Sequence, residues 1–88
     1  MNVTFTLYSK ADCSLCEKAK EALQNFRGEC EFELNVMDIA SDPALLEKYK
    51  YDIPVLHING VEAAKHFIGV EKLRVLAKRY GMTSTTDH

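Results

Sequence analysis

Tryptophan is absent from the 88-residue sequence, and proline and glycine are scarce, with two and four residues respectively. No apolar run approaches the roughly 20 residues that a membrane-spanning helix requires, so we expect no membrane association. The segment from Met1 to Tyr8 has no basic start and no small-residue cleavage site, which argues against a secretory signal. From these absences alone, we expect a cytoplasmic location.

Neither sign of charge is in large excess, because 11 Lys and Arg residues stand against 13 Asp and Glu residues and the formal net charge is -2. Nucleic-acid-binding domains carry clustered basic residues, so no nucleic-acid partner is expected. The 47% hydrophobic and 27% charged residues are typical of a folded chain rather than a disordered one. At this length we expect one domain, which we place at residues 1–81, followed by a flexible polar tail at 82–88. A monomer is the default expectation.

Cysteine is also infrequent, and its number is odd: Cys13, Cys16 and Cys30. An odd number fits poorly with a secreted disulfide framework. A bond between Cys13 and Cys16 would close a loop too short to restrict the unfolded chain strongly. The pair is therefore better explained by chemistry than by structural cross-linking.

Hydrophobic periodicity divides the first half of the chain into three elements. Residues 3–8 alternate apolar side chains with threonine, which indicates a strand. From Ser14 onward, apolar residues recur at helical spacing, and Gly28 provides a C-terminal stop. Residues 32–37 alternate again and predict a second strand through Phe32, Leu34 and Val36.

The second half predicts four further elements. Asp42 and Pro43 have the chemistry of a helix start, with a capping carboxylate followed by a proline. Residues 53–58 are mostly apolar, as in a buried strand, and Asn59-Gly60 is a hairpin signal that leads into a partner strand at 61–67. A final amphipathic helix ends at Gly81. The order β-α-β-α-β-β-α predicts an α/β fold with a mixed four-stranded sheet flanked by helices.

The sharpest feature is the Cys13-Ser14-Leu15-Cys16 motif, which follows a predicted strand and opens a predicted helix. Unpaired N–H groups and the positive end of the helix dipole favour an anion at that position. The thiolate is the reactive form of cysteine. Cys13 is therefore the predicted nucleophile, and Cys16, one turn later and shielded, is the predicted resolving thiol.

Two other interpretations of the cysteine pair remain open at this stage. Cys30, His57 and His66 could join the pair in a zinc site, but no second CxxC or HxxxH pair occurs at zinc-finger spacing. We therefore expect no metal. Alternatively, the two cysteines are inert residues at a helix start in a protein without activity.

The residues from Tyr8 to Cys16, together with Asp52-Ile53-Pro54-Val55 and Asn59-Gly60, resemble the motifs of glutaredoxins. The similarity is closest to small glutaredoxin-like proteins whose second motif reads Tyr-Lys-x-Asp-Ile-Pro-Val, and it extends over about residues 3–80. This resemblance implies a thioredoxin-like fold. It also implies a cis Ile53–Pro54 bond beside the dithiol, with the Ile53 backbone facing a bound peptide or glutathione, and it places Lys10 near a glutathione carboxylate.

The sequence departs from the glutaredoxins at two places. Ser14 and Leu15 stand between the cysteines, where dithiol glutaredoxins carry proline and tyrosine. The resemblance implies that Gly69 and Glu71 contact glutathione, yet Val70 replaces an expected second glycine and adds a side chain where the backbone must approach a ligand closely. In addition, the carboxylate of Asp12 would oppose the effects of Lys10 and of the helix dipole on a thiolate at Cys13.

The residues and the resemblance together predict a thiol–disulfide oxidoreductase that reduces protein or glutathione mixed disulfides through a redox-active Cys13/Cys16 pair. No bound cofactor is expected; glutathione is a possible co-substrate, and glutathione or a reductase would supply the electrons. Two alternatives keep the fold: a non-catalytic peptide-binding module, and an iron–sulfur or metal-binding glutaredoxin-like protein. The intact CxxC favours the enzyme, because a pure binder does not need Cys16 and cluster-binding relatives usually have a single active cysteine.

Overall fold

The computed structural model describes residues 3–82. The helices and strands follow the predicted order: β1 (Thr4–Ser9), α1 (Ser14–Phe26), β2 (Glu33–Asp38), a short 3₁₀ turn (Ile39–Ser41), α2 (Pro43–Tyr49), β3 (Val55–Ile58), β4 (Val61–Lys65) and α3 (Val70–Arg79). The prediction of a flexible tail falls almost wholly outside the described residues, which end at Met82. No described helix has both the length and the apolar character needed to span a membrane.

The four strands form one mixed sheet, as predicted, and their order in the sheet is β2-β1-β3-β4. β1 and β2 run parallel, with Thr4 opposite Glu33, and α1 supplies the crossover that a parallel pair requires. β3 is antiparallel to both β1 and β4. The ladder between β3 and β4 is irregular at Leu56/His57, where the register shifts.

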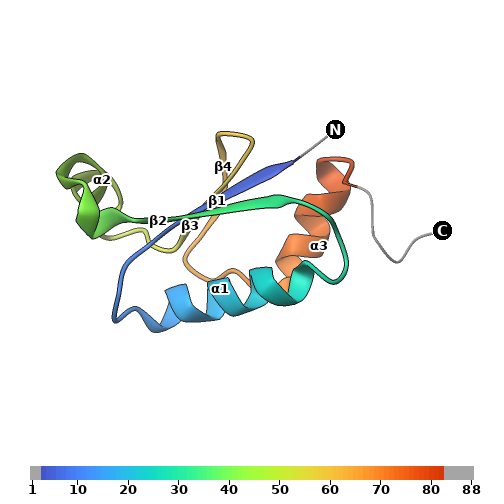
Figure 1. Ribbon diagram of the computed structural model, residues 1–88, viewed down its shortest axis with the longest axis horizontal. Coiled ribbons are helices and arrows are strands. Elements are labelled where there is room, and N and C mark those ends of the chain that lie inside the picture. Colours follow the sequence, from blue (N-terminus) through green and yellow to red (C-terminus); the bar gives the residue numbers. More distant parts are fainter. Residues whose placement is uncertain (1–2, 83–88) are drawn as a thin grey trace.

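One face of the sheet is covered by α1 and α3, which lie on the same side of it (Figure 1). Alternate residues of β1 and β3 point to this side, and they are fully buried together with residues of the two helices. The main core comprises Phe5, Leu7, Ala19, Ala22, Leu23, Phe26, Cys30, Leu56, Ile58, Ala64, Ile68, Leu73, Leu76 and Ala77. Burying each large apolar side chain contributes about 1.5–3 kcal/mol, so this layer accounts for most of the fold's hydrophobic stabilisation.

The opposite face is covered only at one end, by α2 and the 3₁₀ turn. Tyr8 and Val55, which point away from the main core, pack there with Ile39 and Tyr49. The ring of Tyr8 stacks on Tyr49 at 4.7 Å between centroids. In Figure 1, α2 lies beyond the end of the sheet, far from α3.

The two outer strands differ from a fully covered sheet. Val36 is 47% exposed, because β2 is an edge strand and the helical layer does not cover it. The last strand ends at Lys65 and not at residue 67, because His66 adopts a left-handed backbone with φ 69°. As a result Phe67 lies outside the sheet and is 63% exposed.

Candidate active site

A tight turn carries the chain from β1 to the cysteine motif. Lys10, Ala11 and Asp12 are exposed, and Asp12 has φ 61°. Aspartate is one of the few residues that tolerate this left-handed conformation. The structure therefore gives Asp12 a role in shaping the turn that the sequence analysis had not assigned to it.

Cys13 is the N-cap residue of α1. Its backbone is extended, with φ -114° and ψ 110°, and its sulfur accepts a hydrogen bond from the Cys16 N–H at 3.2 Å. This is the place where serine, threonine or aspartate usually satisfies a free N–H of the first helical turn. The Cys13 side chain is half-buried, so the sulfur that caps the helix N-terminus is also accessible to a substrate.

Cys16 lies one turn further along and is fully buried. Burial raises the pKa of its thiol to about 11, and a hydrogen bond to the Cys13 side chain and the negative charge of Cys13 add to this effect. The backbone amide of Lys10 and the charge of Lys20 act in the opposite direction and lower this pKa. Cys16 is therefore held as a protonated thiol at neutral pH, in contact with Cys13.

The Ile53–Pro54 peptide bond is cis, which confirms the expectation from the glutaredoxin resemblance. Tyr8 is paired with Val55 in the antiparallel ladder of β1 and β3. Continuing this register by one residue places Pro54 opposite Ser9. Ser9 is the last residue of β1, and the turn to Cys13 follows it. Pro54 is buried, and its carbonyl accepts a hydrogen bond from the His66 N–H at 2.8 Å.

Ile53 lies just outside the β3 ladder and is half-buried. Within residues 3–82, its backbone N–H and C=O make no hydrogen bond to the protein. We call Ile53 and Pro54 the cis-proline ledge. Because extended backbone with free donor and acceptor groups can pair with another extended chain, this ledge can hold a polypeptide.

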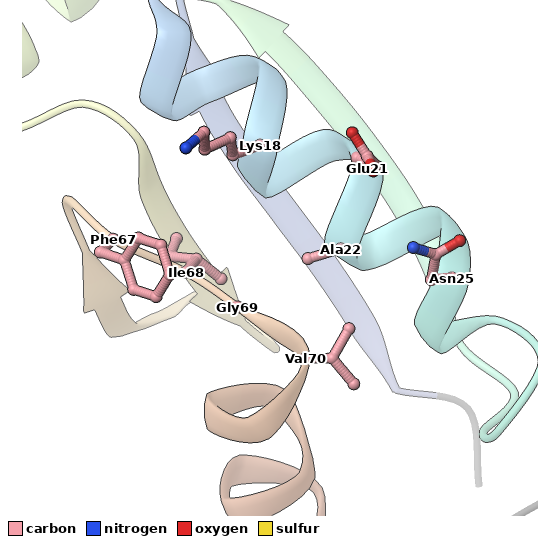
Figure 2. Close-up of a pocket in the computed structure, with 8 residues that line it drawn as sticks. All are labelled: Lys18, Glu21, Ala22, Asn25, Phe67, Ile68, Gly69 and Val70. Atoms are coloured by element: carbon pink, nitrogen blue, oxygen red, sulfur yellow. The ribbon is translucent and has the colours of Figure 1, made fainter.

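Gly69 and Glu71 lie at the start of α3. Gly69 is the N-cap of this helix and provides no side-chain cap, and Glu71 is an exposed residue of its first turn. A groove of about 360 Å³ runs between this segment and α1 (Figure 2). Its lining residues are Lys18, Glu21, Ala22, Asn25, Phe67, Ile68, Gly69 and Val70.

The groove contains functional candidates that the sequence analysis missed. Phe67 had been assigned to a strand, and Lys18 had not been singled out. The only signal in the sequence was a large apolar residue close to Gly69, ahead of a helix. The interaction between Lys10 and a glutathione carboxylate stays a prediction, because the contact seen for Lys10 is the one from its backbone amide to Cys16.

The residues of the zinc alternative are not brought together. In the part of the chain that the structure describes, no group of three or more His, Cys, Asp or Glu side chains is arranged to hold a metal ion. Cys30 is buried between α1 and β2, and burial raises the pKa of its thiol. His57 instead lies against Tyr8 and Tyr49 on the other face of the sheet, and His66 is exposed.

Comparison with solved structures supports the same fold. A protein from X. campestris, XcR50, is 29% identical, with a TM-score of 0.73 over 85% of this chain and 96% of that one. Ne2328 from Nitrosomonas europaea is 23% identical, with a TM-score of 0.72 over 86% of this chain and 92% of that one. The malaria parasite's thioredoxin-2 is 20% identical and matches 89% of this chain and 82% of its own length, with a TM-score of 0.66. The last two identities are low, so these likenesses show the fold alone.

The sequence itself gives a family assignment. The model of the family described as "Glutaredoxin-like domain (DUF836)" matches residues 4–76. This match includes the cysteine motif, the cis-proline ledge, Gly69 and Glu71. The chain therefore belongs to the glutaredoxin-like family and has a thioredoxin-like fold.

Proposed function

We propose that this protein is a thiol–disulfide oxidoreductase in which Cys13 attacks the substrate and Cys16 resolves the intermediate. The observation that supports the proposal best is the contrast between the two thiols. Cys13 is accessible and caps a helix N-terminus with its sulfur, whereas Cys16 is fully buried with a pKa of about 11. This contrast separates a first-reacting thiol from a second one.

In the first step, the Cys13 thiolate attacks one sulfur of a substrate disulfide. A new bond forms between Cys13 and that sulfur, the substrate S–S bond breaks, and the other substrate sulfur leaves as a thiolate. In the second step, Cys16 loses its proton and attacks the Cys13 sulfur. The mixed disulfide breaks, the second substrate thiolate leaves, and Cys13 and Cys16 are left as an oxidised pair, so the substrate has gained two electrons.

The reaction of Cys13 itself prepares Cys16 for the second step. The hydrogen bond to Cys13 and the negative charge of Cys13 both raise the Cys16 pKa. Once Cys13 is part of a mixed disulfide, its sulfur is uncharged, and the charge effect is lost. The Lys10 amide and the Lys20 charge remain and still lower the Cys16 pKa. Deprotonation of Cys16 thus becomes easier only after a substrate has bound covalently.

The proposal also assigns roles around the thiols. The free backbone groups of Ile53 would align an extended segment of the substrate beside Cys13, and Lys10 would meet an acidic group of the substrate. Protein disulfides and glutathione mixed disulfides are the substrates in this proposal. Glutathione or a reductase returns two electrons to the oxidised pair, without a resident cofactor, and the protein acts as a monomer in the cytoplasm.

Intact-mass analysis at a series of reduced-to-oxidised glutathione ratios tests this proposal. The wild-type protein should lose two hydrogen atoms reversibly as the ratio falls. Cys16→Ser should accumulate a mixed disulfide with glutathione at Cys13, and Cys13→Ser should form no such adduct. Cys30→Ser is the matched control, because Cys30 is buried in the main core away from the motif, and it should behave like the wild type. A Cys16→Ser protein that loses activity without trapping an adduct would contradict the assigned roles.

A peptide-binding module is the second candidate, because the free Ile53 backbone would serve a binder equally well. The two candidates differ at Cys16. A binder should retain peptide affinity in the Cys13→Ser/Cys16→Ser variant and show no turnover in the wild type, whereas the oxidoreductase requires both thiols for a complete cycle.

A further inference from the structure

Phe67 is a large apolar side chain that is left in solvent after the end of β4. It is 63% exposed, while the next residue, Ile68, takes the buried position with 1% exposure. The residue before it, His66, donates a backbone hydrogen bond to Pro54 at 2.8 Å. Phe67 therefore lies between the cis-proline ledge and the N-terminus of α3.

The Phe67 ring also covers the backbone of Gly69. A Cβ atom at Gly69 would lie 3.3 Å from Cε2 and 3.4 Å from Cζ of this ring, closer than most side chains approach one another. The glycine thus provides the space that the ring occupies. The side chain of Val70 follows directly, so apolar groups cover the start of α3.

These side chains give the groove a mostly apolar inner surface with a polar rim. Phe67, Ile68 and Val70 contribute from the α3 side, and Ala22 contributes from the middle of α1. The charged and amide groups of Lys18, Glu21 and Asn25 lie along α1 (Figure 2). Such a combination favours binding of a peptide residue whose apolar side chain enters the groove while its backbone makes hydrogen bonds to the polar groups at the rim.

We propose that Phe67 is a specificity-determining residue that makes the site prefer polypeptide disulfides with an apolar side chain near the attacked cysteine over glutathione mixed disulfides. This inference rests on the proposed chemistry of Cys13. Glutathione carries two carboxylates and an ammonium group and has no apolar side chain. Phe67 and Val70 cannot hydrogen-bond such groups, and placing them against apolar surface removes water without replacing its hydrogen bonds.

The length of the groove also favours a polypeptide. Lys18 is five residues beyond Cys13 and Asn25 is twelve beyond, which at 1.5 Å per residue places the groove about 8–18 Å along the helix from the cysteine. An extended chain spans about 3.3–3.6 Å per residue, so the inserted side chain belongs to a residue about two to five positions from the attacked cysteine. Glutathione has a single residue on each side of its cysteine and cannot fill the groove.

The test uses two synthetic peptides, each carrying one cysteine as a mixed disulfide with 2-mercaptoethanol. One peptide has phenylalanine three positions from the cysteine and the other has serine there. The wild-type enzyme should reduce the phenylalanine peptide with roughly tenfold higher kcat/KM, the factor expected for burying most of one large apolar side chain. Phe67→Ala should reduce this ratio to near one, and Phe67→Leu should retain part of it.

Val75→Ala is the matched control, since Val75 is an exposed apolar residue of α3 outside the groove, and it should keep the full preference. Equal rates for the two peptides in the wild type, or an unchanged preference in Phe67→Ala, would overturn the inference. Hydroxyethyl disulfide, which cannot reach the groove, distinguishes a failure of the role of Phe67 from a failure of the proposed function. If the wild type reduces it without discriminating between the peptides, only the role of Phe67 fails; if the wild type reduces no disulfide, the proposed function fails as well.

Discussion

The buried position of Cys16 predicts a large difference in reactivity between two cysteines that are only three residues apart. Its thiol pKa rises from 9.0 to about 11, with burial as the largest cause. At pH 8 about one in ten unperturbed cysteines is ionised, compared with about one in a thousand for Cys16. Because only the thiolate reacts, Cys16 should be alkylated about a hundredfold more slowly than an unperturbed cysteine at this pH.

Brief treatment with iodoacetamide at pH 8, 9 and 10, followed by mass spectrometry, measures this difference. Fragmentation of the peptide that holds both cysteines assigns the label in the singly modified protein. Cys13 should carry nearly all of the label at pH 8, and the rate at Cys16 should rise about tenfold per pH unit, since each unit below a pKa reduces the thiolate tenfold. In protein unfolded in urea, the two cysteines should react at similar rates.

Two results would refute this reasoning. Comparable labelling of Cys13 and Cys16 at pH 8 in the folded protein would show that Cys16 is neither buried nor protonated. The Cys13→Ser variant tests the cause: Cys16 should stay slow, because burial is the largest single cause of its raised pKa. If Cys16 in that variant reacts like a cysteine in a free peptide, the slow reaction comes from Cys13 and not from burial.

Three further predictions concern the fold. Leu23 is fully buried between α1 and the sheet, so Leu23→Ala should lower the free energy of unfolding in urea titrations by about 2–5 kcal/mol. A loss below about 1 kcal/mol would mean that the core is loosely packed here. Gly60→Ala should lower the free energy of unfolding by about 1–2 kcal/mol in the same assay. Gly60 has φ 85°, and no atom lies within 4 Å of an added Cβ, so the loss would come from the backbone conformation alone. A neutral effect would contradict this turn conformation. Burial lowers the pKa of His57 below its usual 6.5, with Lys48 adding to this effect and Glu62 opposing it, so the folded state binds a proton less readily than the unfolded state does. The contribution of His57 to the free energy of unfolding is thus complete above about pH 6.5 and decreases as the pH falls. In urea titrations, His57→Gln should therefore show a smaller drop in unfolding midpoint between pH 7 and pH 5 than the wild type. An equal drop in both proteins would exclude His57 as its source.

Much of the fold follows from interactions between residues that are close in the sequence. The alternation in β1 and the helical spacing in α1 depend on local backbone geometry, and both elements were predicted within one or two residues. The same holds for the start of α2, where the Asp42 carboxylate accepts a hydrogen bond from the Ala44 N–H at 2.9 Å, as its N-cap chemistry predicts. Cys13 at the start of α1 is another local feature, and the sequence was sufficient to place it.

The surroundings of the site depend on which layers cover which strands, and a periodic pattern does not contain that information. Val36 has the spacing of an inward residue, yet it is 47% exposed because no helix covers the outer part of β2. Phe67 continues the pattern of its strand, yet the left-handed backbone of His66 ends β4 before it. Neither outcome could be predicted from a window of a few residues.

This distinction matters most for the choice of substrate. The two cysteines and the cis-proline ledge lie within the segment that matches the family, and in the proposed function they exchange thiols and disulfides without selecting a partner. Selection requires surface outside these features. In our proposal that surface is formed by Phe67, which rests on Gly69, and by Val70, which stands where the glutaredoxin resemblance leads us to expect a second glycine. The departure from the glutaredoxin motif is thus part of the groove, and the proposal places the choice of substrate in the segment between β4 and α3 rather than in the cysteine motif.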